Sequence, residues 1–505
     1  MSGDIYVHDT MTGGKVKFEP LLSGKVGMYC CGPTTYNFPH LGNGRPMVVF
    51  DTIRRYLLHK GYDVTYVSNF TDVDDKIIDK AISEGKSPSE ISERYTRECY
   101  AAADALGVSR ADVHPLVSEH MPEIIAFVED LVSKDLAYPL DGDVYYSVSK
   151  FPEYGKLSKR DIEDLLEGAR VDVDHRKRDA ADFALWKKVK PGEPYWESPW
   201  GPGRPGWHIE CSAMSHKYLG ESFDIHGGGS DLIFPHHENE IAQSEGRFEK
   251  PMAKYWIHNG FITVNQEVMS KSKGNFFTLK DIFEEFEGPV VRFYLLSAHY
   301  RSPLDFDNEK LAMAKRGLER LKNAARAAKA VIDQREGTGA SVGVDAEASV
   351  KAFTAEIDLA DGQFHEAMND DFNSALAIAA LFDMSRAINA YTAESAPDIP
   401  ALKHALERFV TLAGVLGFDL TAGSGARDEG EDEKLSLALS ELIAELGGST
   451  WSDNAIDDKM RTLLSLRKDF RVARDYSKAD KIRDGLKDLG LIVEDTAQGA
   501  RWHRV

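Results

Sequence analysis

Cysteine and long apolar runs are both scarce in this sequence of 505 residues. It holds four cysteines and no uninterrupted apolar stretch of the length, about 18 residues, that a membrane helix needs. So few cysteines do not make a disulfide framework, which favours a reducing compartment. The N-terminal segment lacks the apolar core of a signal peptide. These absences together predict a cytoplasmic protein with no membrane span.

Basic residues are fewer than acidic ones, with 61 Lys or Arg against 82 Asp or Glu, which gives a formal net charge of -21. This balance argues against indiscriminate binding to nucleic acid. The end of the chain differs, since residues 459–505 contain 12 Lys or Arg against 7 Asp or Glu. A basic end on an acidic chain predicts contact with a polyanion at one defined place, and the alternative is chance clustering on a solvated surface.

The chain is too long for a single hydrophobic core, so two to four domains are expected. Residues 25–31 have the pattern of a buried strand, 45–62 that of an amphipathic helix and 63–70 that of a second strand. Two strands joined by a crossover helix predict a parallel sheet. A strand over 222–231 followed by a helix from 235 predicts the second half of that sheet.

Between the two halves, the pattern over 137–149 predicts a hairpin around an Asp-Gly turn. Residues 176–206 are rich in Pro, Gly, Trp and charge, and they are expected to be irregular. From residue 308 onward, apolar residues recur every 3.6 positions, which predicts a helical bundle. The segment 421–434 is expected to be a flexible acidic linker, followed by a small module with a strand near 490–496.

Two of the four cysteines, Cys30 and Cys31, are adjacent on the first strand. Adjacent side chains on a strand point to opposite faces, so one is expected in the core and the other at the carboxyl end of the sheet, where open α/β sheets bind ligands. Cys211 begins a later helix, and His236 and Glu240 share a helix face. One thiolate from each half with a His and a Glu would form a tetrahedral zinc set. The alternative is small core residues and a solvated helix start.

Two short segments have the composition of phosphate-binding loops. His40, Gly42 and Asn43 lie in the turn that leads into the first helix, where glycine permits close approach and the helix N-terminus favours an anion. The second segment, "VMSKSKGN", contains Lys271 and Lys273 in a polar loop that would close on a triphosphate. The alternatives are an ordinary glycine turn and an ordinary exposed basic loop.

Together these motifs resemble class I aminoacyl-tRNA synthetases, and specifically the cysteinyl-tRNA synthetase family. "HLGN" and "VMSKS" match the family's His-Ile-Gly-His and Lys-Met-Ser-Lys-Ser signatures. The resemblance extends over nearly the whole chain, through "MYCCGPTTY", "FTDVDDKII", "GRPGWHIECSAM", "FDIHGGGSDLIFPHHENEIAQSE" and "DDFNSALA". It implies that one Zn²⁺ ion is bound by Cys31, Cys211, His236 and Glu240, with Cys30 left over.

Two positions depart from the family signatures. Asn43 stands where the first signature usually ends in His, and Val268 replaces the first lysine of the second. Lys271, the lysine on which the family relies most, is present, and Lys273 offers partial compensation. We therefore expect altered binding of ATP at most, and not loss of activity.

The resemblance implies a two-step reaction in the cytoplasm. The carboxylate of L-cysteine attacks the α-phosphorus of ATP, which is bound with Mg²⁺, and the adenylate then passes its cysteinyl group to the 3' end of tRNA(Cys). Zinc would select the substrate's thiolate over the hydroxyl of serine. The implied catalytic residues are Lys271, His40 and Asn43. The implied ATP-binding residues are His40, Gly42, Asn43, Gly227, Gly228, Asp231 and Lys271. Cysteine would contact Thr71, Trp207 and His226, and tRNA would contact Tyr476, Asp480 and Trp502.

The resemblance also implies a domain organisation and a monomer. The alternatives are the cysteine ligase of mycothiol synthesis, which joins cysteine to an amino sugar, and a non-catalytic RNA-binding relative. The fold class expected is α/β, with a split Rossmann-type catalytic domain. Its parts are the two catalytic halves (1–115 and 207–265), a connective insertion (116–206), a signature-loop region (266–307), a helical bundle (308–420), a linker (421–434) and an anticodon-binding module (435–505).

Overall fold

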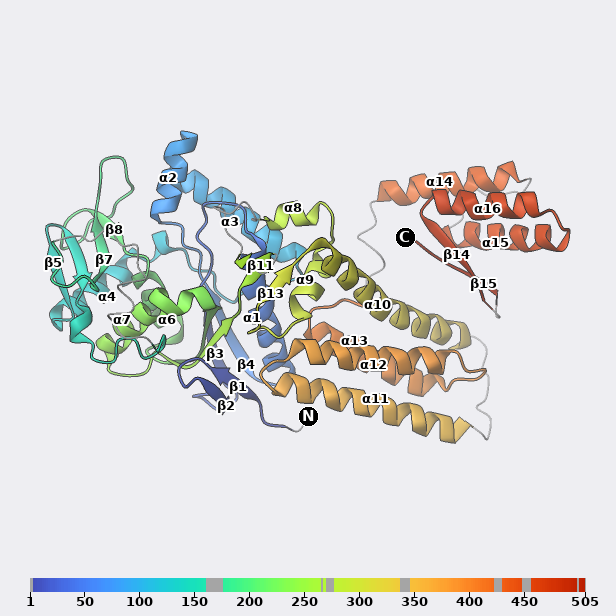
Figure 1. Ribbon diagram of the computed structural model, residues 1–505, viewed down its shortest axis with the longest axis horizontal. Coiled ribbons are helices and arrows are strands. Elements are labelled where there is room, and N and C mark those ends of the chain that lie inside the picture. Colours follow the sequence, from blue (N-terminus) through green and yellow to red (C-terminus); the bar gives the residue numbers. More distant parts are fainter. Residues whose placement is uncertain are drawn as a thin grey trace. The chain divides into compact units, whose positions relative to one another are not determined.

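The computed structural model describes residues 3–159, 176–264, 267–268, 277–336, 346–421, 429–446, 456–496 and 499–504 (Figure 1). Contacts within the chain divide it into two compact units, residues 1–421 and 422–505. Among the described helices, none is both long and apolar enough to cross a membrane.

A four-stranded parallel sheet lies at the centre of the first unit. Its strand order is β10-β9-β3-β4, and every neighbouring pair is parallel. The sheet is therefore assembled from an early and a late part of the chain, which confirms the split α/β fold. The order places β9 beside β3, so the sheet has its switch point there, where open α/β sheets bind ligands. The bounds are β3 Lys25–Cys30, β4 Asp63–Ser68, β9 Phe223–Gly229 and β10 Ala253–Asn259.

The crossover helix between β3 and β4 is α1, Leu41–His59. The predicted start at residue 45 was wrong by four positions, because a capping box begins the helix earlier. The backbone N–H of Asn43 donates to His40 Nδ1 at 3.3 Å, and the backbone N–H of His40 donates to Asn43 Oδ1 at 3.1 Å. The "HLGN" segment therefore forms the first turn of α1, at the positive end of its dipole.

The insertion is an antiparallel sheet in the order β5-β6-β7-β8. The predicted hairpin is present as β5 (Ala137–Leu140) and β6 (Asp143–Tyr146). The expectation that 176–206 is irregular was wrong in part, because β7 (Phe183–Lys188) and β8 (Gly203–Pro205) complete this sheet. Helices α2 (Asp75–Glu84), α3 (Pro88–Ala105) and α4 (Met121–Ser133) precede it, and α6 (Ile209–Leu219) and α7 (Glu238–Phe248) follow.

A short hairpin at the N-terminus, which the sequence did not predict, packs beside the parallel sheet. It consists of β1 (Tyr6–Asp9) and β2 (Gly14–Lys17). Its turn is held on β10, because the backbone N–H of Thr10 donates to the carbonyl of Trp256 at 2.9 Å. In return, the backbone N–H of Trp256 donates to Asp9 Oδ1 at 2.9 Å.

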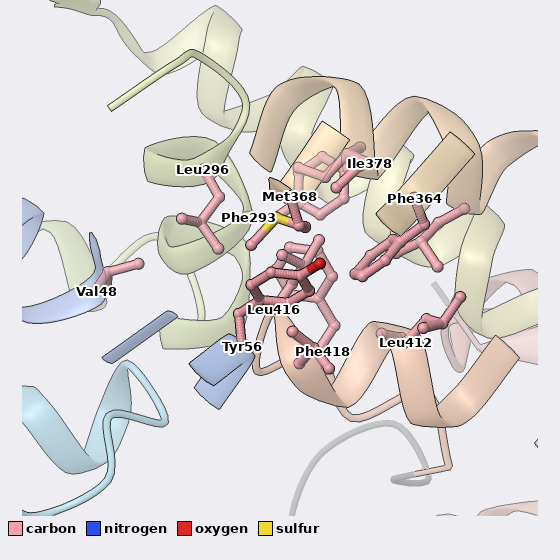
Figure 2. Packing of buried hydrophobic residues seen from close by; sticks show 14 of the residues in the cluster. Val48, Tyr56, Phe293, Leu296, Phe364, Met368, Ile378, Leu412, Leu416 and Phe418 are labelled. Carbon is pink, nitrogen blue, oxygen red and sulfur yellow. The ribbon is translucent and has the colours of Figure 1, made fainter. Parts of the chain in front are cut away.

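After the sheet, the chain forms β11 (Ile262–Val264), β12 (Glu267–Val268), α8 (Leu279–Phe283), α9 (Gly288–Leu296) and β13 (Leu304–Phe306). The predicted bundle follows as α10 (Asn308–Glu336), α11 (Ala346–Asn369), α12 (Ser374–Thr392) and α13 (Ile399–Val415). Its core is continuous with the core around α1. Figure 2 shows side chains of α1, α9 and the bundle packed together: Val48, Tyr56, Phe293, Leu296, Phe364, Met368, Ile378, Leu412, Leu416 and Phe418.

The second unit has a small core of its own, which includes Leu439, Ile443, Met460, Ile482 and Leu486. Its helix α14 (Glu429–Glu445) begins within the segment that was expected to be a linker. Helices α15 (Ile456–Val472) and α16 (Tyr476–Asp488) follow, and the predicted strand is present as β14 (Leu491–Thr496), paired with β15 (Gly499–Arg504).

Candidate metal centre and nucleotide cavity

The structure brings together the four side chains that the sequence singled out as metal ligands. Cys31 directly follows β3, Cys211 lies in the first turn of α6, and His236 and Glu240 flank the start of α7. Their donor atoms lie within 4.8 Å of one another. Cys31 Sγ is 3.5 Å from Cys211 Sγ and 3.4 Å from Glu240 Oε1. His236 Nε2 is 3.0 Å from the same oxygen of Glu240.

These atoms have the chemistry and spacing that a tetrahedral zinc ion requires. Zinc lies about 2.3 Å from a thiolate sulfur and about 2.0–2.2 Å from a nitrogen or oxygen ligand, so tetrahedral ligands are roughly 3.3–3.8 Å apart. Three of the six separations between the donor atoms are 3.0–3.5 Å, and all six are within 4.8 Å. Three of the ligands are buried and Cys31 is half-buried. A metal in this position would be shielded from bulk water on most sides.

A second group of donors overlaps the first. Cys31 and Glu240 also lie within 4.8 Å of His226 and His237. His226 Nε2, however, is hydrogen-bonded to the other carboxylate oxygen of Glu240, at 2.8 Å, and His237 Nε2 is 4.0 Å from the oxygen that faces Cys31. The first group also offers two thiolates, which zinc prefers as soft ligands. The predicted group is therefore the better candidate site.

The charges of the four groups are tightly coupled. Burial opposes ionisation of Glu240, but His226 and His236 outweigh it and lower the pKa of Glu240 to about 2. Burial also opposes a charged His236, whereas Glu240 and Cys211 raise its pKa to about 10. For Cys211, the cost of burial is exceeded by the hydrogen bond from Cys31 and by His236, and the pKa falls to about 6. A protonated His236 thus offsets one of the two negative charges of Glu240 and Cys211, and a bound divalent cation would supply positive charge in its place.

The residues predicted to shape the cysteine pocket contact this centre either directly or through a neighbouring residue. Trp207 stacks on His236, with ring centroids 4.3 Å apart and 30° between the planes. It is 38% exposed, so part of the indole also faces the adjacent cavity. Thr71 is buried and donates its hydroxyl to Glu210 Oε2 at 2.8 Å. His226 is fully buried and holds Glu240, as described above.

Sequence reasoning missed two polar groups beside the centre. Glu210 is 1% exposed, and its Oε1 has no hydrogen-bond partner among the residues that the structure describes. Burial and the adjacent Cys211 raise the pKa of Glu210 well above the usual range. His237 Nε2 lies 3.4 Å from Cys31 Sγ, and its other nitrogen contacts His258. Glu210 could have been found from the sequence, because it is a charged residue next to Cys211 in the segment "WHIECSAM". Nothing in the sequence indicated that His258 lies near the metal site.

A cavity of about 500 Å³ opens next to the centre, at the carboxyl end of the sheet. Five of the residues predicted to bind ATP or cysteine line it: His40, Gly42, Asn43, Trp207 and Asp231. Burial raises the pKa of the Asp231 carboxyl. Both the first turn of α1 and Cys31 therefore face one space that has room for a nucleotide and an amino acid.

Gly227 and Gly228, which were predicted to let the nucleotide approach, do not line this cavity. An added Cβ on Gly227 would come within 2.1 Å of the Phe50 ring, and one on Gly228 within 3.0 Å of His237. Both glycines therefore permit close packing inside the sheet. The next residue, Gly229, does line the cavity.

The adjacent cysteines occupy different surroundings, as the strand pattern indicated. Cys30 is 3% exposed and belongs to the core that includes α1, and burial raises the pKa of its thiol above the usual range. Cys31 packs against the core on the side of the insertion. Lys271 and Lys273 lie outside the described residues, and Val268 ends β12.

Two of the residues predicted to contact tRNA lie on α16 in the second unit. Tyr476 is the first residue of this helix and is 60% exposed. Asp480, one turn later, is also largely exposed and pairs with Arg483 at 3.0 Å. Trp502 lies on β15, opposite Val493, and its side chain is outside the described part. The spacing of Tyr476 and Asp480 places them on one face of the helix.

Comparison with known proteins gives consistent matches along the chain. Residues 17–316 match the family described as "tRNA synthetases class I (C) catalytic domain", and residues 363–421 match the DALR domain. A cysteine–tRNA ligase of Heliobacterium modesticaldum is 53% identical over 504 residues, which cover 99% of each chain. A cysteine–tRNA ligase of Pelotomaculum thermopropionicum is 53% identical over 503 residues, again with 99% of each chain covered.

Solved structures show the same fold at much lower identity. Mycobacterium tuberculosis methionyl-tRNA synthetase with methionyl-adenylate has a TM-score of 0.56 and 15% identity, over 78% of this chain and 89% of that one. The Agrobacterium radiobacter LeuRS in a ternary complex with tRNA has a TM-score of 0.56 and 13% identity, over 82% and 88% of the two chains. At these identities the likeness is one of fold alone.

Proposed function

The chain belongs to the cysteine–tRNA ligase family of class I aminoacyl-tRNA synthetases, and we propose that it selects cysteine with zinc before joining it to tRNA(Cys). ATP would be converted to AMP and pyrophosphate. The observation that carries this proposal is the pair of cysteines, with His236 and Glu240, beside a cavity that also contains the first turn of α1.

Zinc would be bound by Cys31, Cys211, His236 and Glu240. When bound, it would take the substrate's sulfur as a thiolate, which is a better ligand than the protonated hydroxyl of serine. A plain pocket distinguishes the two amino acids poorly, since they differ only in sulfur and oxygen. The buried and hydrogen-bonded setting of Glu240 supports a rigid site, because His226 already holds one of its oxygens.

The protein's own side chains would align the reacting groups for activation. His40 and Asn43 would bind phosphates of ATP with Mg²⁺ at the positive end of α1, with Gly42 allowing close approach. Lys271 would stabilise the charge that develops at the α-phosphate. Asp231 would border the nucleotide, while Thr71, Trp207 and His226 would surround the cysteine. Such a reaction depends mainly on positioning and on charge stabilisation.

The second unit would bind the anticodon of tRNA(Cys). The exposed ring of Tyr476 supports stacking on a base, and Asp480 is exposed at the next turn of the same helix face. Trp502 would add a second stacking surface. The predicted domain boundaries and the monomeric state stay proposals. The cytoplasm stays the proposed location, because zinc ligation requires reduced thiols.

The test is incorporation of labelled cysteine into tRNA, with serine as a parallel substrate and with zinc content measured on the same protein. Cys31→Ala should lose bound zinc and cysteine activation. Cys30→Ala is the matched control, since its side chain points to the other face of the strand, and it should keep its zinc. Equal charging with serine, or zinc that survives Cys31→Ala, would refute the proposed selection.

The same assays separate the alternatives. Cysteine-dependent pyrophosphate exchange without charging of tRNA would point to an amino-sugar acceptor, as in the cysteine ligase of mycothiol synthesis. Binding of tRNA without exchange would point to a non-catalytic relative. Neither alternative has a supporting observation among the described contacts.

A further inference from the structure

A line of three side chains ends at the sulfur of Cys31. His237 Nε2 is 3.4 Å from Cys31 Sγ, and His237 Nδ1 is 2.8 Å from His258 Nε2. The remaining nitrogen of His258, Nδ1, is 2.8 Å from Thr10 Oγ1. His237 is fully buried and His258 is 6% exposed, so water does not compete along most of this line. The three residues come from the turn before α7, from β10 and from the N-terminal hairpin.

The chemistry of a metal-bound thiolate fixes the direction of these hydrogen bonds. A thiolate has no proton, so the proton between His237 and Cys31 must sit on His237 Nε2. A neutral imidazole has one donor and one acceptor, so His237 Nδ1 must accept from His258 Nε2–H. His258 Nδ1 is then an acceptor, and the hydroxyl of Thr10 must donate to it. Two ring nitrogens 2.8 Å apart cannot both carry a proton, so the single proton between the histidines lies on His258 Nε2.

We propose that Thr10, His258 and His237 form a directed hydrogen-bond chain that positions Cys31 and weakens its sulfur as a metal ligand. The proposal rests on the zinc site proposed above. A donor N–H draws electron density from a thiolate, and groups behind a ligand tune the metal in this way. The metal would then keep enough affinity for one more sulfur, that of the substrate. Four full-strength protein ligands would otherwise satisfy it.

Thr10, the residue at the far end of the hydrogen-bond chain, is itself held in place by backbone contacts. The backbone N–H of Thr10 donates to the carbonyl of Trp256, two residues before His258 on β10. Asp9 Oδ1 accepts from the backbone N–H groups of both Trp256 and Met11, at 2.9 and 3.1 Å. The hairpin turn therefore places the Thr10 hydroxyl at a defined distance from His258. This gives the N-terminal hairpin a role in tuning a metal site to which it contributes no ligand.

Thr10→Val tests the chain, because it keeps the shape of the side chain and removes the hydroxyl. Thr12→Val is the matched control, since Thr12 lies in the same turn and its hydroxyl donates to the carbonyl of Asp9 at 3.3 Å, away from the histidines. Cobalt(II) replaces zinc in each variant, and the sulfur-to-cobalt charge-transfer bands report the electron density on the thiolates. The KM values for cysteine and for ATP are measured on the zinc forms.

We expect Thr10→Val to move the charge-transfer bands to longer wavelength. The KM for cysteine should rise about tenfold, which is the lower end of the range seen for groups behind a metal ligand. The KM for ATP and the effects of Thr12→Val should stay near the original values, and Thr10→Ser should restore both readouts. The proposal would be overturned if Thr10→Val and Thr12→Val had the same charge-transfer bands and the same KM for cysteine. So would X-ray absorption that counts two imidazoles on zinc, because His237 would then be a ligand. A wild-type protein that binds neither metal would overturn the zinc site as well.

Discussion

Arg292 in α9 is a buried cation whose removal should weaken the first unit strongly. Its guanidinium is fully buried, and it donates to one carboxylate, one hydroxyl and three backbone carbonyls. These acceptors come from α1, from the loop after α3 and from the end of α13. They are Asp51, Thr52, Leu106, Gly107 and Leu416. We predict the effect of Arg292→Met, which keeps the length of the side chain and removes all five hydrogen bonds.

The expected loss is about 4 kcal/mol of unfolding free energy. Removal of one partner of a buried ion pair costs roughly 3–5 kcal/mol. In the variant, Asp51 still has Arg55 as a partner, because Arg55 Nε donates to the same oxygen at 2.7 Å. The cost of breaking the ion pair should therefore lie at the lower end of this range. The carbonyl of Leu416, 2.6 Å from Arg292 Nε, loses its buried donor and adds about 1 kcal/mol.

Urea unfolding of the full chain, followed by tryptophan fluorescence, measures this loss, because five of the seven tryptophans precede residue 422. Arg55→Met is the matched control. Its side chain is 28% exposed and pairs with the same carboxylate, so it should cost no more than about 1 kcal/mol. A loss below about 1 kcal/mol for Arg292→Met, or one equal to that of Arg55→Met, would refute the reasoning.

Three further outcomes are expected. Chelation of the metal should abolish cysteine-dependent pyrophosphate exchange, and added Zn²⁺ should restore it; exchange that persists in the chelated protein would exclude a role for the metal. Burial lowers the pKa of His114, whose two nitrogens contact the carbonyl of Ser68 and the N–H of Ala111. Because the unfolded chain then binds this proton more readily than the folded one, the free energy of unfolding should fall as the pH drops below about 6.5, by up to about 1.4 kcal/mol per pH unit. His114→Gln should reduce that slope in pH-dependent unfolding. Asn43→Ala should cost about 1 kcal/mol through the lost cap and raise the KM for ATP, and an unchanged KM would place Asn43 outside the nucleotide site.

Residue type and local spacing indicated one of the two adjacent cysteines together with Cys211, His236 and Glu240 as possible metal ligands, and the family resemblance selected Cys31. The alternation of side chains on a strand separated Cys30 from Cys31, and the i, i+4 spacing placed His236 beside Glu240. Parallel strands end at one edge of the sheet, so ligands 180 and 209 positions apart meet there. These inferences needed the order of the strands but no detail of side-chain packing.

Other features depend on contacts that local patterns do not contain. His258 has the spacing of an ordinary core residue on β10, and only the docking of the N-terminal hairpin gives it a partner in Thr10. The start of α1 was misplaced because His40 is an unusual cap, and the reciprocal bond from Asn43 supplies what the residue type alone does not. Strand β8, Gly203–Pro205, follows a Pro- and Gly-rich segment, and its pairing with β7 overrides that composition.

The continuous core of the first unit bears on how such enzymes exchange parts during evolution. Helix α1 also buries Tyr56 beside the bundle, where its hydroxyl donates to Asn369 Oδ1 at 2.7 Å, and Arg292 ties the same helix to the end of α13. A bundle taken from another synthetase would therefore have to arrive with a matching α1 and α9. The unit of residues 422–505 has a separate core, so it is the segment that recombination can replace without disturbing the active site.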